Sequence, residues 1–226
     1  MAEDSEVSGS ALMKIVETIA ISPDDARAVV NQYKEQIRSK QPGASSDHIQ
    51  KLVTDKIIQR YSKLAATSGG ATSLAGVVPG VGTAVSAIGG SMADISICLK
   101  LQIDMTMCLA IAINDGLSNE DAKHMSFYVA LSGSLEKLVS DATTRTASKA
   151  AVKIADGLLK KATLKAIKEL FAKFGIAFTK KAALKAIPFG VGVVVGASVN
   201  YAISRYVGAV ARDVFSIHSK SSESVS

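Results

Sequence analysis

The sequence predicts an all-α helical bundle with two glycine-rich apolar helical hairpins or segments and one basic amphipathic helix. Of the 226 residues, 48% are hydrophobic but only 5% are aromatic, and there is no Trp. This composition disfavours β-sandwiches and barrels, which need aromatic and β-branched residues. The apolar content also argues against disorder, whereas a charged fraction of 20% argues against a multi-span transporter. The chain is therefore helical and richer in apolar residues than a soluble bundle needs.

Residues 1–63 have the pattern of soluble amphipathic helices. Ser22 to Asp25 combine a capping hydroxyl, a proline for the first helical position and acids for the positive end of the helix dipole. The helix that starts there should reach about Lys40, because Gln41-Pro42-Gly43 follows. Ser46-Asp47 should start the next helix, whose apolar residues recur at helical spacing.

The pattern changes between Leu64 and Ala93, where thirty residues carry no charge and seven are glycine. The run is long enough to cross a bilayer, which needs about 20 apolar residues. Pro79 to Gly82 interrupt it near the middle, so we expect a helical hairpin rather than one straight span. Gly76 and Gly80 have the GxxxG spacing that lets two helix backbones approach closely.

The following apolar helix, residues 94–113, contains three charged residues: Asp94, Lys100 and Asp104. Lys100 and Asp104 are four positions apart, so they share a face and can pair. Asp94 lies roughly 80° around the helix from Asp104 and flanks that face. Two interpretations are open. The charged sector faces water in a soluble bundle, or it lines a polar lumen at membrane depth, where charges are costly and usually functional.

The segment from Ala142 to Lys185 holds Arg145 and ten lysines against two acids, a net charge of +9 in a chain whose total is +6. Phe and Ile residues fall on one side of a helix here and lysines on the other. The pattern is typical of a basic amphipathic helix at a membrane interface, and also of a core-facing helix in a soluble bundle. The candidate contacts to anionic lipid are Lys160, Lys161, Lys165, Lys168, Lys173, Lys180, Lys181 and Lys185.

A second uncharged run spans residues 186–204, and Gly192 and Gly196 in it repeat the GxxxG spacing. We expect the two glycine-rich runs to pack together, so that leucine at Gly76 or Gly192 disrupts assembly or folding. Gly9 lies in the polar N-terminal segment and is expected to tolerate leucine.

These elements divide the chain into three parts. Residues 1–63 are the soluble N-terminal helices, residues 64–215 a membrane-associating domain, and residues 216–226 a disordered polar tail.

Two stretches resemble the EcsC family, whose members are membrane-associated bacterial proteins. They are GGATSLAGVVPGVGTAVSAIGGSMADISICLKLQID at 69–104 and IPFGVGVVVGASVNYAISRYVGAVARDVF at 187–215. The resemblance covers the second half of the chain and the first apolar run, but not residues 1–45. It implies membrane association and a bacterial source. It transfers no catalytic residue, because the family has no agreed active site.

Motifs of enzymes are absent from the sequence. It contains no GxxxxGK[ST], GxGxxG, GxSxG, HExxH or CxxC motif, and its three histidines are far apart. Cys98 and Cys108 are ten residues apart on one helix, too far to form a disulfide, and we expect inert buried thiols. We therefore expect no catalytic residue, no metal and no cofactor. Nucleic acid is not an expected partner, since no recognition motif accompanies the lysines.

The leading hypothesis is a non-enzymatic protein that inserts into membranes, such as a cation-conducting pore-forming toxin or secreted effector, with Asp94, Lys100 and Asp104 along its water path. The alternative is a peripheral membrane scaffold or interaction protein, and a fully soluble bundle is third. The expected partners are an anionic lipid membrane, further copies of the chain if it forms a pore, and a neutralising protein. The N-terminus is acidic and polar, so we expect synthesis in the cytosol without a signal peptide, and any export by a signal-independent route.

Overall fold

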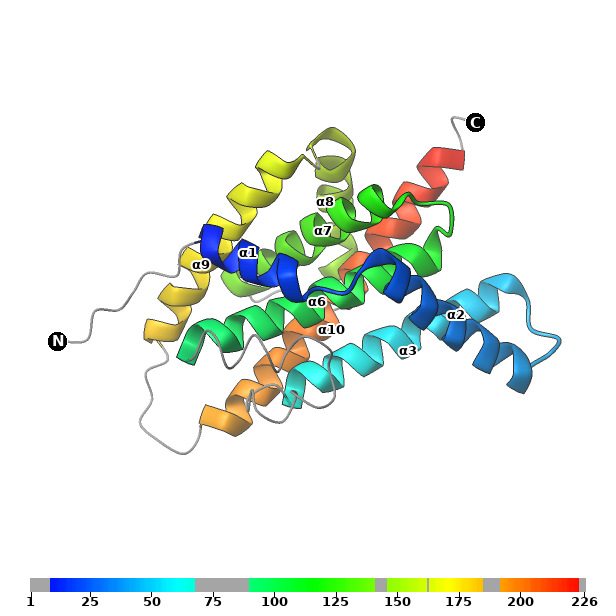
Figure 1. Cartoon of the computed structure of the whole chain (residues 1–226), viewed down its shortest axis with the longest axis horizontal. Helices are drawn as coiled ribbons and strands as arrows, with labels where there is room; N and C mark the ends of the chain where they lie inside the picture. Colours follow the sequence, from blue (N-terminus) through cyan, green and yellow to red (C-terminus); the bar gives the residue numbers. More distant parts are fainter. Residues whose placement is uncertain (1–8, 68–89, 141–145, 162, 185–191, 224–226) are drawn as a thin grey trace.

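The structure is a computed structural model that describes residues 9–67, 90–140, 146–161, 163–184 and 192–223. These residues form a helical bundle and contain no strand, which confirms the predicted fold class (Figure 1). The helices are α1 (Gly9–Ile19), α2 (Pro23–Lys40), α3 (Ser46–Thr67), α6 (Gly90–Ile113), α7 (Asn119–Val139), α8 (Ala147–Lys161), α9 (Leu164–Leu184) and α10 (Gly192–Glu223).

Local sequence signals explain where several helices begin. The Ser22 side chain accepts a hydrogen bond from the Asp25 N–H at 3.1 Å and caps α2, whose first residue is Pro23. Ser118 caps α7 in the same way by accepting from the Asp121 N–H at 3.1 Å. Each capping side chain satisfies one of the backbone donors that a helix start leaves unpaired. The predicted boundaries of α2 and the predicted start of α3 at Ser46 are confirmed.

Helix α6 is the centre of the bundle. Every side chain from Ile95 to Ala112 is buried, and the helix contacts α1, α2, α3, α7 and α10. Apolar residues occur all around it, as is typical of a helix enclosed by others. Ile97, Leu101 and Met105 belong to the larger core with α2, α3, α7, α8 and α10. Ile95, Leu99 and Ile103 belong to a second core with α1, α7 and α9.

The N-terminal helices share these cores and do not form one of their own. Ile49, Val53 and Ile57 of α3 pack in the larger core, and α3 continues to Thr67, past the predicted boundary at residue 63. The predicted disordered tail is also partly wrong. Helix α10 continues through residue 216 to Glu223, because Val214 and Phe215 are buried against the bundle and hold this end of the helix in place.

Candidate functional site

Lys100 and Asp104 form a salt bridge inside the bundle, as their spacing predicted. Their side chains are only 3% and 4% exposed. The second carboxylate oxygen of Asp104 accepts a hydrogen bond from the Ile21 N–H at 2.8 Å. Ile21 lies in the connection between α1 and α2, so the pair joins the central helix to the N-terminal helices.

The surroundings of Asp104 act on its pKa in opposite directions. Burial raises the pKa of the Asp104 carboxyl group, whereas the Lys100 ammonium and the Ile21 N–H lower this pKa. Ion pairing and hydrogen bonding compensate for part of the cost of removing a charge from water. In this arrangement the two charges face protein on all sides. The side chain of Asp94 lies outside the described residues.

Three other polar side chains of α6, those of Gln102, Thr106 and Cys108, contact neighbouring helices. The Cys108 thiol and the Tyr61 hydroxyl of α3 are 3.8 Å apart, and burial raises the pKa of Cys108 to about 12. Such a thiol is inert at neutral pH, because the thiolate is the reactive form. Gln102, which no motif in the sequence marks, accepts a hydrogen bond from the Ser134 hydroxyl of α7. Both cysteines are buried, and neither forms a disulfide.

The basic segment folds into α8 and α9, and its apolar stripe faces the bundle. Ile167, Phe171 and Phe174 are buried in the second core, where the rings of Phe171 and Phe127 lie 6.2 Å apart. The Phe stripe is therefore the core-facing side of α9.

The lysines lie on the opposite side of these helices. The structure describes the side chains of five of these lysines, and all five are exposed: Lys149 and Lys153 of α8, and Lys165, Lys168 and Lys173 of α9. We call these five residues the basic surface.

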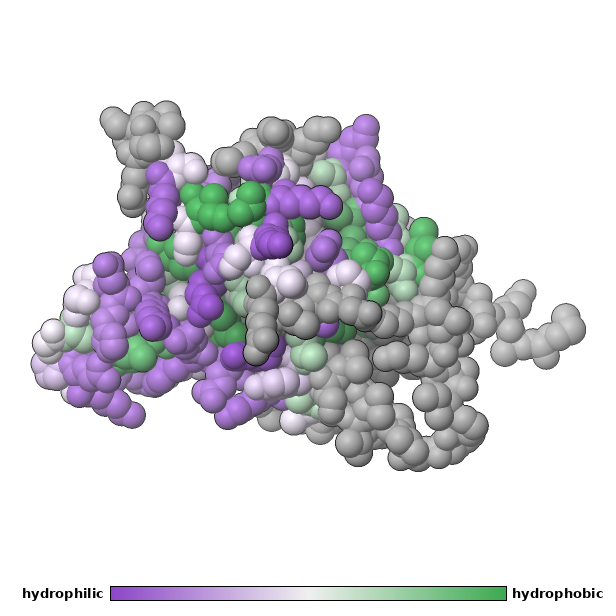
Figure 2. All heavy atoms as spheres, turned by 180° about the vertical axis from the view of Figure 1, so that it is seen from behind, coloured by the Kyte–Doolittle hydropathy of each residue, from purple (hydrophilic) through white to green (hydrophobic). Residues whose placement is uncertain are grey.

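Apolar side chains are exposed among these lysines. Val152 of α8 is 53% exposed, and Leu164 and Ile176 of α9 are each 47% exposed. Figure 2 shows hydrophobic residues in separate patches between hydrophilic ones over the described part of the face behind Figure 1. A mixture of lysines and single apolar side chains suits the boundary between lipid headgroups and acyl chains.

Several predicted site residues lie outside the described part of the chain. Gly76, Gly80 and Lys185 are among them, as are the side chains of Lys160, Lys161, Lys180 and Lys181. Gly192 and Gly196 belong to α10, but their surroundings are outside it as well.

Gly208 lies where α10 approaches α3 and α6 closely, although it is not part of a GxxxG pair. A Cβ atom on Gly208 of α10 would lie 2.9 Å from Ile58 Cγ1 of α3 and 3.2 Å from Met105 Sδ of α6. The expectation for Gly9 is wrong: a Cβ there would lie 2.5 Å from the Ala172 Cα of α9. Helix α1 begins at Gly9 and packs on α9, so this glycine belongs to a backbone contact.

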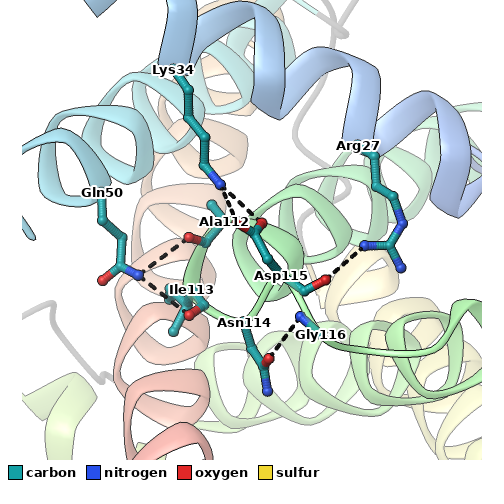
Figure 3. A network of polar contacts seen from close by, with 8 residues as sticks. All are labelled: Arg27, Lys34, Gln50, Ala112, Ile113, Asn114, Asp115 and Gly116. Atoms are coloured by element: carbon teal, nitrogen blue, oxygen red, sulfur yellow. Dashed lines mark hydrogen bonds and ion pairs between the residues drawn. The ribbon is translucent and has the colours of Figure 1, made fainter. Parts of the chain in front are cut away.

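Side chains of α2 and α3 hold the turn between α6 and α7 (Figure 3). Lys34 Nζ is 2.7 Å from Asp115 Oδ2, and Arg27 donates to the Asp115 carbonyl at 3.3 Å. Gln50 donates to the Ala112 and Ile113 carbonyls, both at 3.3 Å. These bonds satisfy carbonyl groups that the end of α6 leaves unpaired. The network holds the C-terminal end of the central helix against α2 and α3.

Two broader features bear on function. Within the described ranges, no group of three or more His, Cys, Asp or Glu side chains could hold a metal ion. The same ranges contain one helix, Ile95–Ile113 of α6, that is long and apolar enough to cross a membrane, and it is wholly buried in the bundle. The core helix of a soluble protein has the same length and composition, so this feature alone does not indicate a span.

The family model described as the EcsC protein family matches residues 11–217. Neither a curated protein nor a solved structure matches the chain. The family match extends over residues 11–45, which the sequence resemblance did not cover, and so includes α2 and α1 from residue 11 onward.

Proposed function

The chain belongs to the EcsC family, and from this premise we propose that it is a non-enzymatic interaction protein that attaches peripherally to anionic membranes through the basic surface of α8 and α9. The observation that carries the proposal is the exposure of five lysines beside Val152, Leu164 and Ile176. Only Asp156 and Glu169 oppose their charge on these two helices. Each lysine near an anionic leaflet contributes about 1 kcal/mol, less at high salt.

The burial of α6 favours peripheral attachment over insertion. Insertion would require α6 to leave contacts with five other helices. It would also bring Lys100 and Asp104 toward lipid, at about 2.5–3.5 kcal/mol each on insertion scales. Attachment through α8 and α9 leaves both cores and the buried ion pair intact.

The test is cosedimentation with phosphatidylcholine vesicles, with and without phosphatidylserine. Changing Lys165, Lys168 and Lys173 together to Gln should weaken binding to the anionic vesicles more than a hundredfold, since three lysines contribute about 3 kcal/mol. The matched control changes Lys51, Lys63 and Lys123 to Gln, which removes the same charge from exposed positions on α3 and α7. Equal loss in both triple variants, or binding that salt does not weaken, would reject the proposed surface.

A membrane-inserting, cation-conducting pore is the second candidate, favoured by the length and apolar composition of α6. For this candidate, Asp104→Lys should reduce cation preference in planar bilayers, because carboxylates on the lumen side favour cations. For peripheral attachment, the same change places a second cation beside Lys100 in the core and only destabilises the fold. Ion conductance by the purified protein would support the pore, and its absence in every lipid composition would rule the pore out.

A further inference from the structure

The groove between α2, α3 and α10 carries cationic side chains from all three helices. Its volume is about 680 Å³. Lys40 lines it from the last turn of α2, Lys56 from α3 and Arg205 from α10. None of the residues that line this groove belongs to α8 or α9, so the groove and the basic surface share no residue, and in Figure 1 α2 lies at the other end of the bundle from α9.

Two of these cations are available to a ligand. Lys40 and Arg205 are exposed, and neither forms an ion pair with another described residue. The Lys56 ammonium lies 5.8 Å from the centre of the Tyr33 ring, which orients the side chain without neutralising it.

Negative charge near the groove is weaker than the positive charge. Asp55 also lines the groove, but its carboxylate pairs with Arg212 at 2.9 Å. The C-terminal end of α2 contributes about half of an elementary negative charge. Three cations exceed these contributions, so the groove attracts anions.

The walls of the groove also include apolar groups. Ile37, which is buried, and Leu52, which is half-buried, form part of the lining beside the exposed ring of Tyr201. A ligand that fits both kinds of surface has an anionic group next to a carbon skeleton. Arginine binds phosphate oxygens in a bidentate manner, and lysine adds a mobile point charge.

We propose that the groove formed by Lys40, Lys56 and Arg205 binds a phosphate monoester. The phosphate contacts the three cations, and the carbon part lies against Ile37 and Leu52. Two sources share this chemistry: a soluble phosphate ester and the headgroup of a phosphatidic acid lipid. The proposal does not depend on membrane attachment through α8 and α9.

The test measures binding of two probes to the full chain by titration calorimetry at low salt. Glycerol 1-phosphate represents the soluble ester, dihexanoyl phosphatidic acid below its micelle concentration represents the lipid, and glycerol is the uncharged control. Lys40→Gln and Arg205→Gln should each weaken binding about tenfold or more, because each removes a charge-assisted hydrogen bond. Arg38→Gln in the same turn as Lys40, and Lys51→Gln on the same helix as Lys56, should leave affinity unchanged, since neither residue lines the groove.

The outcomes separate the two sources. Similar affinity for both probes assigns the groove to soluble phosphate esters, whereas binding of the lipid probe alone assigns it to a headgroup. Absence of binding by either probe overturns the proposal, as does an equal loss in the Arg38 or Lys51 variants. Unchanged thermal unfolding shows that the variants fold. The Lys165, Lys168 and Lys173 triple variant should bind both probes normally, so failure of the membrane proposal leaves this result unaffected.

Discussion

Lys100 and Asp104 show how one pair of residues connects the core to the N-terminal helices. Replacing one member of a buried ion pair leaves an uncompensated charge and costs about 3–5 kcal/mol. Lys100→Met should therefore lower the free energy of unfolding by this amount, measured by urea denaturation at neutral pH.

The matched variant is Lys100→Met combined with Asp104→Asn. It removes both charges and keeps an amide oxygen that can accept the Ile21 N–H. We expect this double variant to be more stable than Lys100→Met alone, because no buried charge remains. Additive destabilisation in the double variant would show that the pair is not coupled as the structure indicates.

The buried thiol and phenol of Cys108 and Tyr61 predict a loss of stability at alkaline pH. Burial raises the pKa of Cys108 from about 9 to about 12 and also raises the pKa of Tyr61. Above pH 9 the unfolded chain releases protons that the folded chain retains. The free energy of unfolding must then fall as pH rises from about 9 toward 12.

Cys108→Ala tests this linkage. This variant lacks one of the two groups that retain their proton in the folded chain, so it should lose stability less steeply than the parent chain over this pH range. Urea unfolding at several pH values gives the two slopes. Identical slopes would mean that Cys108 does not retain its proton in the folded chain.

At the scale of the helices, the packing around Gly208 predicts that alanine at this position lowers stability. The sequence alone does not predict this effect. A methyl group at Gly208 enters the contact of α10 with Ile58 and Met105. Alanine gains about 1 kcal/mol of helix propensity over glycine, but overpacking costs about 1–3 kcal/mol. Gly208→Ala should therefore destabilise the chain in thermal unfolding. Ile58→Ala in the same chain should relieve the clash and give a favourable coupling energy.

Gly43 is the matched control for this substitution. A Cβ atom at Gly43 has no neighbour within 4 Å, so Gly43→Ala should leave stability unchanged or raise it slightly. Destabilisation of equal size at both glycines would show that the close approach of α10 to α3 and α6 is not what constrains Gly208.

The helices differ in how far their sequences predict them. The starts of α2 and α7 follow from Ser22 and Ser118, because capping depends on residues within one turn. The Lys100–Asp104 pair follows from its spacing for the same reason. The contact at Gly208 and the bond from Ile21 to Asp104 join distant parts of the chain. A local pattern does not specify such contacts, and for the same reason it did not identify the groove between α2, α3 and α10.

At the scale of the whole molecule, much of the apolar content of the chain lies in and around α6, which five other helices enclose. The sequence of α6 fits a membrane span or a buried core helix equally well, because lipid and protein interiors are both apolar. In this structure α1, α2, α3, α7 and α10 surround α6, as other helices surround a buried core helix. The lysines then belong to the outer face of α8 and α9, and their Phe stripe belongs to the core.

This arrangement predicts how the molecule behaves on a membrane. If attachment is peripheral, amide hydrogen exchange in α6 should remain as slow on phosphatidylserine vesicles as in solution, because the helix stays enclosed. Exchange should slow in α8 and α9, where lipid covers the surface, and vesicles loaded with a fluorescent dye should not leak. The triple variant of Lys165, Lys168 and Lys173 provides the control, since its exchange should not change when vesicles are added. Faster exchange in α6 together with dye release would contradict peripheral attachment, because both require the central helix to leave the bundle and enter the bilayer.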